Sequence, residues 1–541
     1  MDIELNLPRT GKIALLLAMT LVPRAVADNQ VRIDSGIIEG KPAPEPGVRA
    51  FLGIPFAAPP VGDLRWREPQ PVTPWEGVRP ATEFGPRPMQ GSVYSDMVFR
   101  DTGPSEDCLT LNVWTPAKSA GARLPVMVWI YGGGFNAGGT SEPRQDGGHL
   151  AGKGVVVVSM NYRLGVFGFF SHPGLAAESG RGSSGNYGIM DQTAALRWVK
   201  RNIGAFGGDP GNVTIFGESA GSYSVSILMA TRTARGLFQK AIGESGSKVG
   251  TRRIPATVVA LADAEKGGVQ FADAMKAKSI ADLRARSSGD VLRSAIGDKL
   301  FKTQVAVDGY VLTQTVYAIY SEGGQARVPL LAGWNADESR ASAVFGSKRP
   351  TAQSFAASIR AEYGDLADQV LRLYPSDTDA EAVRSAGDLA GDRFIVASTW
   401  NWIEMQLRTG VPVYRYSFDR AVPVAPGTMV NGSPATGADI GATHASEIPY
   451  VFGALGSHRN VTFEPGDWKL SETMETYWTN FAKTGSPNGR GVPEWPRYLA
   501  KDNYPVMHLD LAVHAAPEVH RPRHAFWDLA STATPVANPS Q

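Results

Sequence analysis

Cysteine is almost absent from this chain, since Cys108 is the single cysteine among 541 residues. A lone thiol excludes a disulfide within the chain and a zinc site built from cysteine pairs. Histidines and carboxylates do not take the spacing of a metal-ligand cluster, and the chain has neither a GxGxxG motif nor a phosphate-binding P-loop. We therefore expect neither a metal nor a cofactor.

A charge excess of one sign is also lacking. The chain has 53 lysines and arginines against 52 aspartates and glutamates, and its formal net charge is +1. We therefore expect no basic field that would attract nucleic acid or an anionic membrane surface. The expected partner is a small molecule, and the composition does not define an oligomeric state.

Long hydrophobic runs are lacking too, apart from a short one near the N-terminus. Basic residues precede the apolar stretch Ile13–Val22, and Ala25-Val26-Ala27 has the small-x-small form of a cleavage site. This order is typical of a secretory signal peptide, residues 1–27, removed after Ala27. An uncleaved anchor helix is the alternative, but the stretch is shorter than the roughly 20 residues that span a bilayer. We expect one exported domain, residues 28–541, periplasmic or extracellular.

Glycine and proline are abundant instead, with 60 and 38 residues. They bound short apolar runs typical of buried strands, and helical patterns such as Asp191–Asn202 alternate with these runs. Such alternation predicts an α/β fold with a mostly parallel sheet flanked by helices. Two helical, Ala-rich stretches, 255–300 and 350–400, are expected to form lid-like insertions over the sheet. The expected strands are Val126–Ile130, Val155–Met160, Val213–Phe216, Lys240–Gly243, Pro329–Gly333 and Val411–Ser417.

A serine lies between two glycines where an expected strand meets an expected helix, in Gly217-Glu218-Ser219-Ala220-Gly221. G-x-S-x-G in this position is the nucleophile elbow, whose turn is so tight that small residues are needed two positions before and after the serine. The pattern alone recurs by chance, and a glycine-rich turn is the alternative. Its place between strand and helix favours Ser219 as a nucleophile.

Three consecutive glycines, Gly132-Gly133-Gly134, follow the expected strand Val126–Ile130. A nucleophilic serine needs N–H donors for the oxyanion that it creates, and backbone amides converge on an oxygen only where no side chain blocks them. A flexible turn is the alternative, and a second glycine pair at 138 and 139 is compatible with it. The strand followed by three glycines favours an oxyanion hole.

Longer motifs surround these two sites and follow one another in a defined order. They are FLGIPFAAPPVGDLRW (51–66), SEDCLTLNVW (105–114), YGGGF (131–135), NYRLGVFGF (161–169), FGGDPGNVTIFGESAGS (206–222) and THASEIPYVFG (443–453). Together they resemble the type-B carboxylesterase family, which includes the cholinesterases and has the α/β-hydrolase fold. The resemblance extends over nearly the whole chain after residue 27.

The resemblance assigns the other two members of a catalytic triad. The family's acid follows a buried strand in a D-E-G motif, which places it here at Glu338, with Ser339 in place of the glycine. The family's histidine corresponds to His444, and the order Ser…Glu…His is that of α/β-hydrolases. His444 would take the proton of Ser219 while Glu338 orients the imidazole. Asp337 is the alternative acid.

The resemblance also implies supporting groups around the triad. Ser245 matches a serine that supports the acid. The oxyanion donors carried over from the family are the amides of Gly133, Gly134 and Ala220. The ion pairs that match loop-holding pairs of the family are Arg65–Glu106 and Arg163–Asp191.

The chain departs from the family at a disulfide and at the choline site. The family's partner for Cys108 falls where Pro88 stands, so we expect a free, buried thiol and an unstapled loop over residues 88–108. The aromatic positions of the choline site fall on Val98, Ala341 and Ser342. Without ring faces a cation–π site is lost, so cholinesterase activity is not expected.

Basic residues stand close to these positions. Arg252 falls on an acyl-pocket position of the family, and Arg340 follows the expected acid Glu338. Because guanidinium groups bind carboxylates through paired hydrogen bonds, both arginines are predicted to bind an acyl group with free carboxylates. A solvated loop surface is the alternative. In this respect the chain is similar to bacterial esterases that remove tricarballylic acid from fumonisins.

The function expected from these motifs is a secreted serine carboxylesterase that forms an acyl-enzyme. Its expected substrates are carboxylic esters, including fumonisin-type esters of polycarboxylic acids. One alternative is a catalytically weak cholinesterase-like binding or adhesion module, although such modules usually lack a triad member. The other alternative is a transacylase that uses the same acyl-enzyme.

Overall fold

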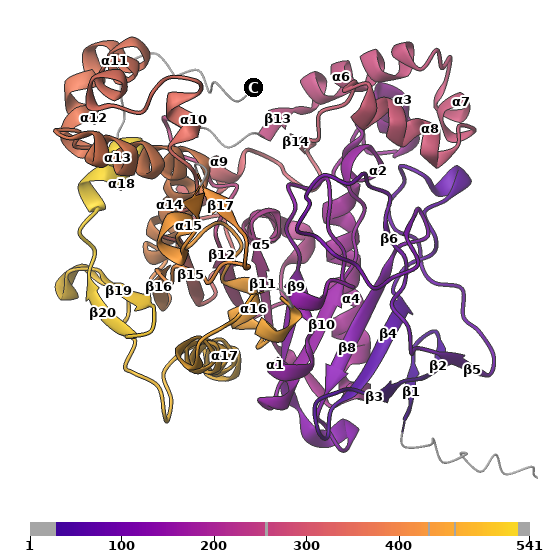
Figure 1. The fold of residues 1–541 in the computed structure, drawn as a ribbon. Coiled ribbons are helices and arrows are strands. Elements are labelled where there is room, and N and C mark those ends of the chain that lie inside the picture. The colour runs from indigo at the N-terminus through magenta and orange to yellow at the C-terminus, as the bar shows by residue number, and fades with distance from the viewer. Residues whose placement is uncertain (1–28, 255–257, 431–432, 459–460, 529–541) are drawn as a thin grey trace, which may run out of the picture.

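The structure is a computed structural model that describes residues 29–254, 258–430, 433–458 and 461–528. The expected signal peptide lies outside these residues. An 11-stranded sheet runs through the middle of the molecule, with the strand order β20-β19-β16-β15-β12-β11-β9-β10-β8-β4-β3 (Figure 1). Several strands that are neighbours in the sheet are therefore not consecutive in the chain.

The central strands of this sheet are parallel and its edges are antiparallel, which confirms the expected sheet type. Each of the six expected strands overlaps an observed one. The parallel strands are β10 (Val156–Met160), β9 (Leu124–Ile130), β11 (Gly208–Glu218), β12 (Lys240–Glu244), β15 (Leu330–Asn335), β16 (Val413–Phe418) and β19 (Pro505–Leu509). The antiparallel edge strands are β8 (Thr110–Thr115), β4 (Arg49–Pro55), β3 (Lys41–Pro42) and β20 (His514–Pro517).

Helices cover the parallel strands, whose residues are buried on both faces. Every residue of β10, β12 and β15 is buried, as continuous apolar strands require in a parallel sheet. The helix expected at Asp191–Asn202 begins earlier, at Tyr187. The helices that pack on the central strands are α4 (Tyr187–Asn202), α5 (Ala220–Ala230), α14 (Ala397–Leu407) and α17 (Pro465–Thr484).

The two expected helical insertions lie at the same end of the molecule, on opposite sides of the view in Figure 1. One contains α6 (Leu261–Ala274), α7 (Ile280–Arg284) and α8 (Ser288–Leu292). The other contains α11 (Ala352–Tyr363), α12 (Ala367–Leu373) and α13 (Asp379–Gly391). This second group has an apolar core of its own, which includes Phe355, Tyr374 and, from the C-terminal helix α18 (Arg521–Asp528), Trp527. A π-helical turn, η8 (Asp392–Val396), joins α13 to α14.

The loop over residues 88–108 is held without a disulfide. Cys108 is a free, buried thiol, as expected. Strands β6 (Arg87–Pro88) and β7 (Pro104–Ser105) pair at the base of the loop. Arg87 Nη1 also lies 2.6 Å from Asp101 Oδ1, and the Asp101 side chain is fully buried. A short strand pair and a buried carboxylate therefore hold this loop. In the family that the chain resembles, a disulfide closes it.

The two expected ion pairs are present and tie segments that are distant in sequence. Arg65 Nη2 lies 2.6 Å from Glu106 Oε2, and Arg65 Nη1 donates to backbone carbonyls around Leu283. Arg163 Nη2 lies 2.8 Å from Asp191 Oδ1 of helix α4, and both side chains are buried. These pairs therefore position loops on the sheet.

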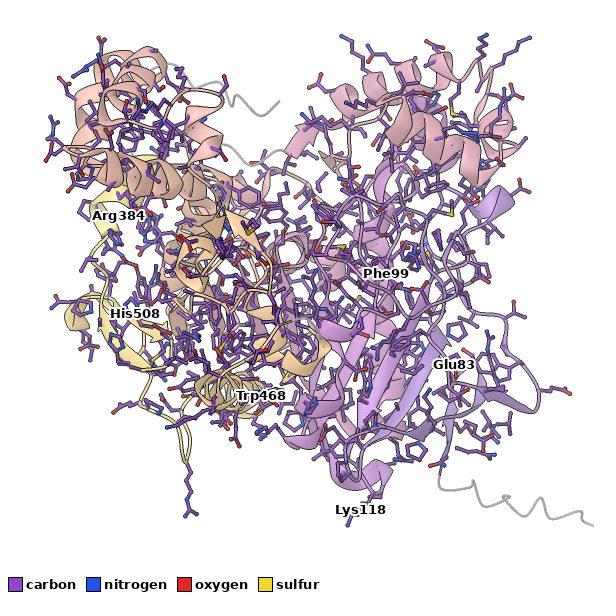
Figure 2. All side chains as sticks on the ribbon, viewed as in Figure 1. Glu83, Phe99, Lys118, Arg384, Trp468 and His508 are labelled. Carbon is purple, nitrogen blue, oxygen red and sulfur yellow. The ribbon has the colours of Figure 1, made fainter. Side chains whose placement is uncertain are left out.

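Charged side chains such as Lys118 and Arg384 lie at the outer surface (Figure 2). Among the helices that the structure describes, none combines the length and the apolar character needed to cross a bilayer. In the same part of the chain, no three His, Cys, Asp or Glu side chains gather in a way that could hold a metal ion.

Candidate active site

Ser219 occupies the turn between strand β11 and helix α5, with φ 53° and ψ −118°. A residue with a Cβ atom is strained at a positive φ, and such strain persists only where the surroundings impose it. A Cβ on Gly217 would lie 2.6 Å from the carbonyl oxygen of Ile130, and a Cβ on Gly221 would lie 1.9 Å from the same atom. Only glycine fits at these two positions, as the elbow turn requires.

The three-glycine segment lies directly against the elbow. A Cβ on Gly132 would lie 3.0 Å from Ser219 Cβ, and Gly133 and Gly134 have positive φ values of 97° and 64°. Within the residues that the structure describes, the amides of Gly133, Gly134 and Ala220 donate to no protein acceptor. These N–H groups remain available to an oxygen atom bound beside Ser219.

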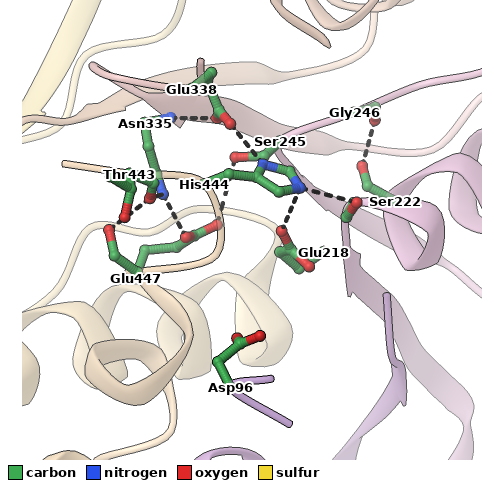
Figure 3. A network of polar contacts seen from close by, with 12 residues as sticks. Asp96, Glu218, Ser222, Ser245, Gly246, Asn335, Glu338, Thr443, His444 and Glu447 are labelled. Carbon is green, nitrogen blue, oxygen red and sulfur yellow. Dashed lines mark hydrogen bonds and ion pairs between the residues drawn. The ribbon is translucent and has the colours of Figure 1, made fainter. Parts of the chain in front are cut away.

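A line of hydrogen bonds joins Ser219 to His444 and His444 to Glu338. His444 Nε2 lies 2.9 Å from Ser219 Oγ, and His444 Nδ1 lies 2.6 Å from Glu338 Oε2. The other oxygen of Glu338 accepts the amide of Asn335 at 2.7 Å, which fixes the carboxylate (Figure 3). The alternative acid, Asp337, instead accepts the amide of Ala442 at 2.8 Å. The geometry thus places Glu338 and not Asp337 at the imidazole.

A second carboxylate, Glu218, reaches the same imidazole from the other side. Figure 3 shows the ring of His444 between Glu338 and Glu218, and Glu218 Oε1 lies 3.2 Å from His444 Nε2. Sequence reasoning missed Glu218, although it directly precedes the serine in the elbow motif. A residue that precedes the nucleophile in so tight a turn is necessarily near the reacting atoms, and this was the available signal.

Glu447 completes this group of buried acids and corrects one expectation. Ser245 was expected to support Glu338, but its hydroxyl lies 3.5 Å from Glu447 Oε1. Asn335 Nδ2 donates to the other oxygen of Glu447 at 2.6 Å. Asn335 therefore connects the two acids, donating its amide to Glu338 and its side chain to Glu447.

The buried acids change the protonation of the imidazole. Burial raises the pKa of Glu218 to about 8, against the opposing effect of the His444 charge. Burial lowers the pKa of His444, but Glu218 and Glu338 outweigh burial and raise that pKa to about 10. A proton on Glu218 would remove one of the charges that raise the pKa of His444, while Glu338 would continue to raise it.

A cavity of about 310 Å³ opens beside Ser219 and His444. The ring of Phe394, carried by the π-turn η8, stands 5.2 Å from the His444 ring, and the hydroxyl of Tyr94 lies beside Gly134. Neither side chain belongs to a motif, so neither could be predicted from the sequence. The aromatic residues of the wall are Tyr94, Tyr131, Tyr223 and Phe394, and the charged ones are Asp96, Glu142, Arg144 and Glu218.

Two expected substrate-binding residues lie away from this cavity, and the structure corrects that prediction. Neither Arg252 nor Arg340 lines it. Arg252 is exposed, and its Nε donates to the hydroxyl of Tyr317 at 3.0 Å. Arg340 is also exposed, and its Nη1 donates to the carbonyl of Asp439 at 3.4 Å. Both guanidinium groups keep much of their hydration on the surface, so the alternative of a solvated loop face applies.

The expected positions of the choline site likewise do not line the cavity. Val98 is 63% exposed, and neither it nor Ala341 nor Ser342 contributes to the wall. Rings from other positions line the cavity instead. Assigning pocket positions by counting residues from the nearest family motif therefore does not identify the side chains that line the cavity.

The family model and two relatives that match this chain all describe esterases. The model of the carboxylesterase family matches residues 27–527 of this chain. The fumonisin B1 esterase of Sphingopyxis macrogoltabida is 37% identical over 514 residues, which cover 89% of this chain and 88% of that protein. The para-nitrobenzyl esterase of Bacillus subtilis is 35% identical over 491 residues, which cover 89% of this chain and 96% of that protein.

A solved structure shows the same likeness in three dimensions. A structure of PNB esterase superposes with a TM-score of 0.76 at 32% sequence identity. The superposition covers 93% of this chain and the whole of the other chain. The expected α/β-hydrolase fold is thereby confirmed.

Proposed function

Since this chain belongs to the carboxylesterase family and is a carboxylic ester hydrolase, we propose that it acts through an acyl-enzyme formed on Ser219. The observation that carries the proposal is the hydrogen-bonded line from Ser219 to His444 at 2.9 Å and on to Glu338 at 2.6 Å. In the proposed roles, Ser219 is the nucleophile, His444 the general base and Glu338 the residue that orients and stabilises the imidazolium.

The first half of the reaction transfers the acyl group to the serine. Ser219 Oγ forms a bond to the carbonyl carbon of the ester while its proton passes to His444 Nε2. The carbonyl oxygen becomes an oxyanion that accepts hydrogen bonds from the amides of Gly133, Gly134 and Ala220. When the tetrahedral intermediate collapses, the bond to the alcohol oxygen breaks and His444 returns the proton to that oxygen.

The second half releases the acid. A water molecule gives one proton to His444 Nε2 as its oxygen attacks the acyl carbon, and a second tetrahedral intermediate forms in the same oxyanion hole. The bond from the acyl carbon to Ser219 Oγ then breaks, and Oγ recovers its proton from His444. The products are a carboxylic acid, an alcohol and the free enzyme.

The proposed substrates are esters of polycarboxylic acids, of which fumonisin-type tricarballylic esters are the example. The support is the likeness to a protein named fumonisin B1 esterase, at 37% identity over most of both chains.

We also propose that the chain is exported and that cleavage after Ala27 leaves Asp28 at the mature N-terminus, because residues 1–27 have the order of a signal peptide. N-terminal sequencing of the secreted protein tests this cleavage.

Replacement of the nucleophile tests the mechanism. Ser219→Ala should fold normally and lose at least about 10⁴-fold in kcat on a simple phenyl ester, because the triad acts as a unit. Ser224→Ala, in the same helix, is the matched control and should stay within a few fold of the wild type. A fluorophosphate should transfer its phosphoryl group, with loss of fluoride, to the peptide that contains Ser219 and to no other. A folded Ser219→Ala variant with a tenth of the wild-type activity would show that another residue is the nucleophile.

A further inference from the structure

Arg144 is the only guanidinium group that borders the Ser219 cavity in the described part of the chain. It also borders a neighbouring cavity of about 190 Å³. The two cavities meet at a shared set of residues, which are Asp96, Arg144, His444 and Ala445. A positive charge therefore stands where the two spaces join, next to the proposed general base.

The hydrogen-bonding capacity of Arg144 is only partly used. Its side chain is 13% exposed, with Nη1 3.0 Å from Asp96 Oδ2 and Nε 2.7 Å from Glu142 Oε1. Within the described residues, Nη2 takes part in no hydrogen bond. A guanidinium has five N–H donors in a planar fork, so donors remain on the edge that faces Asp96.

The two carboxylates that neutralise Arg144 differ in how firmly they are held. The Glu142 side chain is 4% exposed and also accepts Gln145 Nε2 at 2.9 Å. Asp96 is 64% exposed and lies outside any helix or strand. An exposed ion pair contributes little to stability because water and salt screen it. Glu142 is thus held beside Arg144 by a buried contact, whereas Asp96 has one hydrogen bond among the described residues, the one to Arg144.

The position of Arg144 relates it to the leaving group of the ester. The proposed mechanism requires His444 to return a proton to the departing alcohol oxygen, so the leaving group must lie against His444. Arg144 shares both cavities with His444. Although burial lowers the pKa of Arg144, Glu142 and Asp96 outweigh burial and raise it, so the group remains a cation.

On the basis of the proposed function, we propose that Arg144 binds a carboxylate carried by the leaving group of the ester, and that this carboxylate takes the place of Asp96. Arg144 then determines specificity for substrates whose alcohol part bears further acid groups, whereas Arg252 and Arg340 do not line the cavity. Asp96 keeps the guanidinium neutralised and oriented while no substrate is bound.

A matched pair of esters tests the inference. In 4-acetoxybenzoate the leaving phenol carries a carboxylate, and 4-acetoxybenzamide is its neutral counterpart. Arg144→Gln should lower the ratio of kcat/KM for the two esters by about ten- to a hundredfold, as expected for a lost charge-assisted hydrogen bond. Asp96→Asn should raise the same ratio severalfold, because the competing carboxylate is removed. Arg252→Gln and Arg340→Gln are the controls and should leave it unchanged.

A second pair of esters locates the carboxylate. Phenyl hydrogen succinate carries its carboxylate on the acyl side, and phenyl propionate is the neutral reference. Arg144→Gln should not change the ratio for this pair, and a loss here instead of in the first pair overturns the assignment to the leaving group. An unchanged ratio for the first pair, or a ratio that falls in Asp96→Asn, overturns the inference as a whole.

Two further outcomes keep the inference separate from the proposed function. If Arg144→Gln does not fold, Arg144→Lys and the exposed Asp96→Asn decide, since Lys retains the charge but loses the fork and should give an intermediate ratio. Wild-type hydrolysis of the neutral esters that disappears in Ser219→Ala supports the proposed function even where the ratios refute the role of Arg144. A wild type that cleaves none of the esters refutes both.

Discussion

At the scale of single residues, the two carboxylates on either side of His444 have different effects on its protonation. Glu338 lies 2.6 Å from Nδ1 and orients the ring, whereas Glu218 lies 3.2 Å from Nε2, the nitrogen that must accept the serine proton. An ionised Glu218 stabilises the imidazolium, so the resting ring stays protonated to a higher pH, and a protonated ring cannot accept the serine proton. A protonated Glu218, favoured at neutral pH by its pKa of about 8, removes this effect.

The first prediction follows from this charge. Glu218→Gln removes a carboxylate that raises the pKa of His444, so that pKa should fall and the imidazole should stay neutral at lower pH. The acid limb of the kcat/KM profile should therefore move to lower pH. Glu142→Gln, which removes another acid of the cavity wall, is the control and should move the limb much less. A limb that moves to higher pH would contradict the electrostatic role of Glu218.

The second prediction distinguishes neighbouring acids. Glu338→Gln should lower kcat by about 10⁴-fold with little change in KM, because the ring of His444 loses its orientation while the substrate contacts remain. Asp337→Asn should have a much smaller effect, since Asp337 accepts a backbone amide and does not touch the imidazole. Steady-state kinetics of both variants test whether Glu338 is the acid of the triad. A larger loss of kcat in Asp337→Asn than in Glu338→Gln would reverse this assignment.

At the scale of elements, one buried carboxylate connects several parts of the loop over residues 88–108. Asp101 accepts Arg87 Nη1 at 2.6 Å, Ser141 Oγ at 2.5 Å and the amide of Gly103 at 2.8 Å. This loop also carries Tyr94 and Asp96 to the cavity wall. The positions of these two residues in the cavity wall therefore depend on the hydrogen bonds and the ion pair of Asp101. The cysteine content alone does not predict these interactions.

The third prediction concerns this anchor. Asp101→Ala leaves Arg87 without its partner, and breaking a buried ion pair costs about 3–5 kcal/mol of unfolding free energy. Urea unfolding should show the loss, and limited proteolysis should cut the loop between residues 89 and 100. Asp107→Ala, at an exposed position of the same loop, should change neither measurement. An Asp101→Ala variant as stable and as protease-resistant as the wild type would show that the β6–β7 pair suffices.

The C-terminal helix α18 provides the fourth prediction. His524 packs between Trp334 and Trp400, and burial holds its pKa well below the ordinary value of 6.5. Because the folded pKa is depressed, the stabilisation is present above pH 6.5 and is lost as the pH falls below it, where the unfolded chain binds the proton. His524→Leu should therefore reduce the loss of Tm between pH 7 and pH 5, whereas the exposed His514→Leu should not. An unchanged acid sensitivity in His524→Leu would exclude this group as its source.

At the scale of the whole molecule, stability comes from the buried sheet and not from covalent links. The core of the described chain extends from strand β4, next to the edge strand β3, through the central strands to helix α17. Burial raises the pKa of the Cys108 thiol well above its usual value, so little of the reactive thiolate forms. The chain has no other sulfhydryl group with which Cys108 could pair.

The fifth prediction is that reducing agents leave both Tm and activity unchanged. Cys108→Ser should lower Tm by only a few degrees, since one small buried group is exchanged for a more polar one of similar size. Differential scanning fluorimetry with and without reductant checks this expectation. Reductant-sensitive dimers on a denaturing gel would mean that Cys108 pairs between chains.

The features that could be predicted from the sequence are those that depend on local backbone geometry and on burial of whole strands. Gly217, Gly221, Gly132 and Gly133 are readable because a Cβ atom there would meet backbone within 3 Å, and Gly134 because its φ is positive. The apolar runs are readable as strands for a similar reason, since a parallel sheet buries both faces of each strand. Motif resemblance then identified Glu338 and His444, which the fold brings within 3 Å of their partners.

The side chains that surround the substrate cavity could not be predicted without the three-dimensional fold. Arg144, Tyr94 and Phe394 reach it from three separate segments, and no local pattern marks any of them. Arg252 and Arg340 stand near motif positions but turn to the surface, where a guanidinium keeps its hydration. The direction of a loop side chain depends on the elements packed around it, which are distant in sequence. That information is absent from the spacing of residues along the chain.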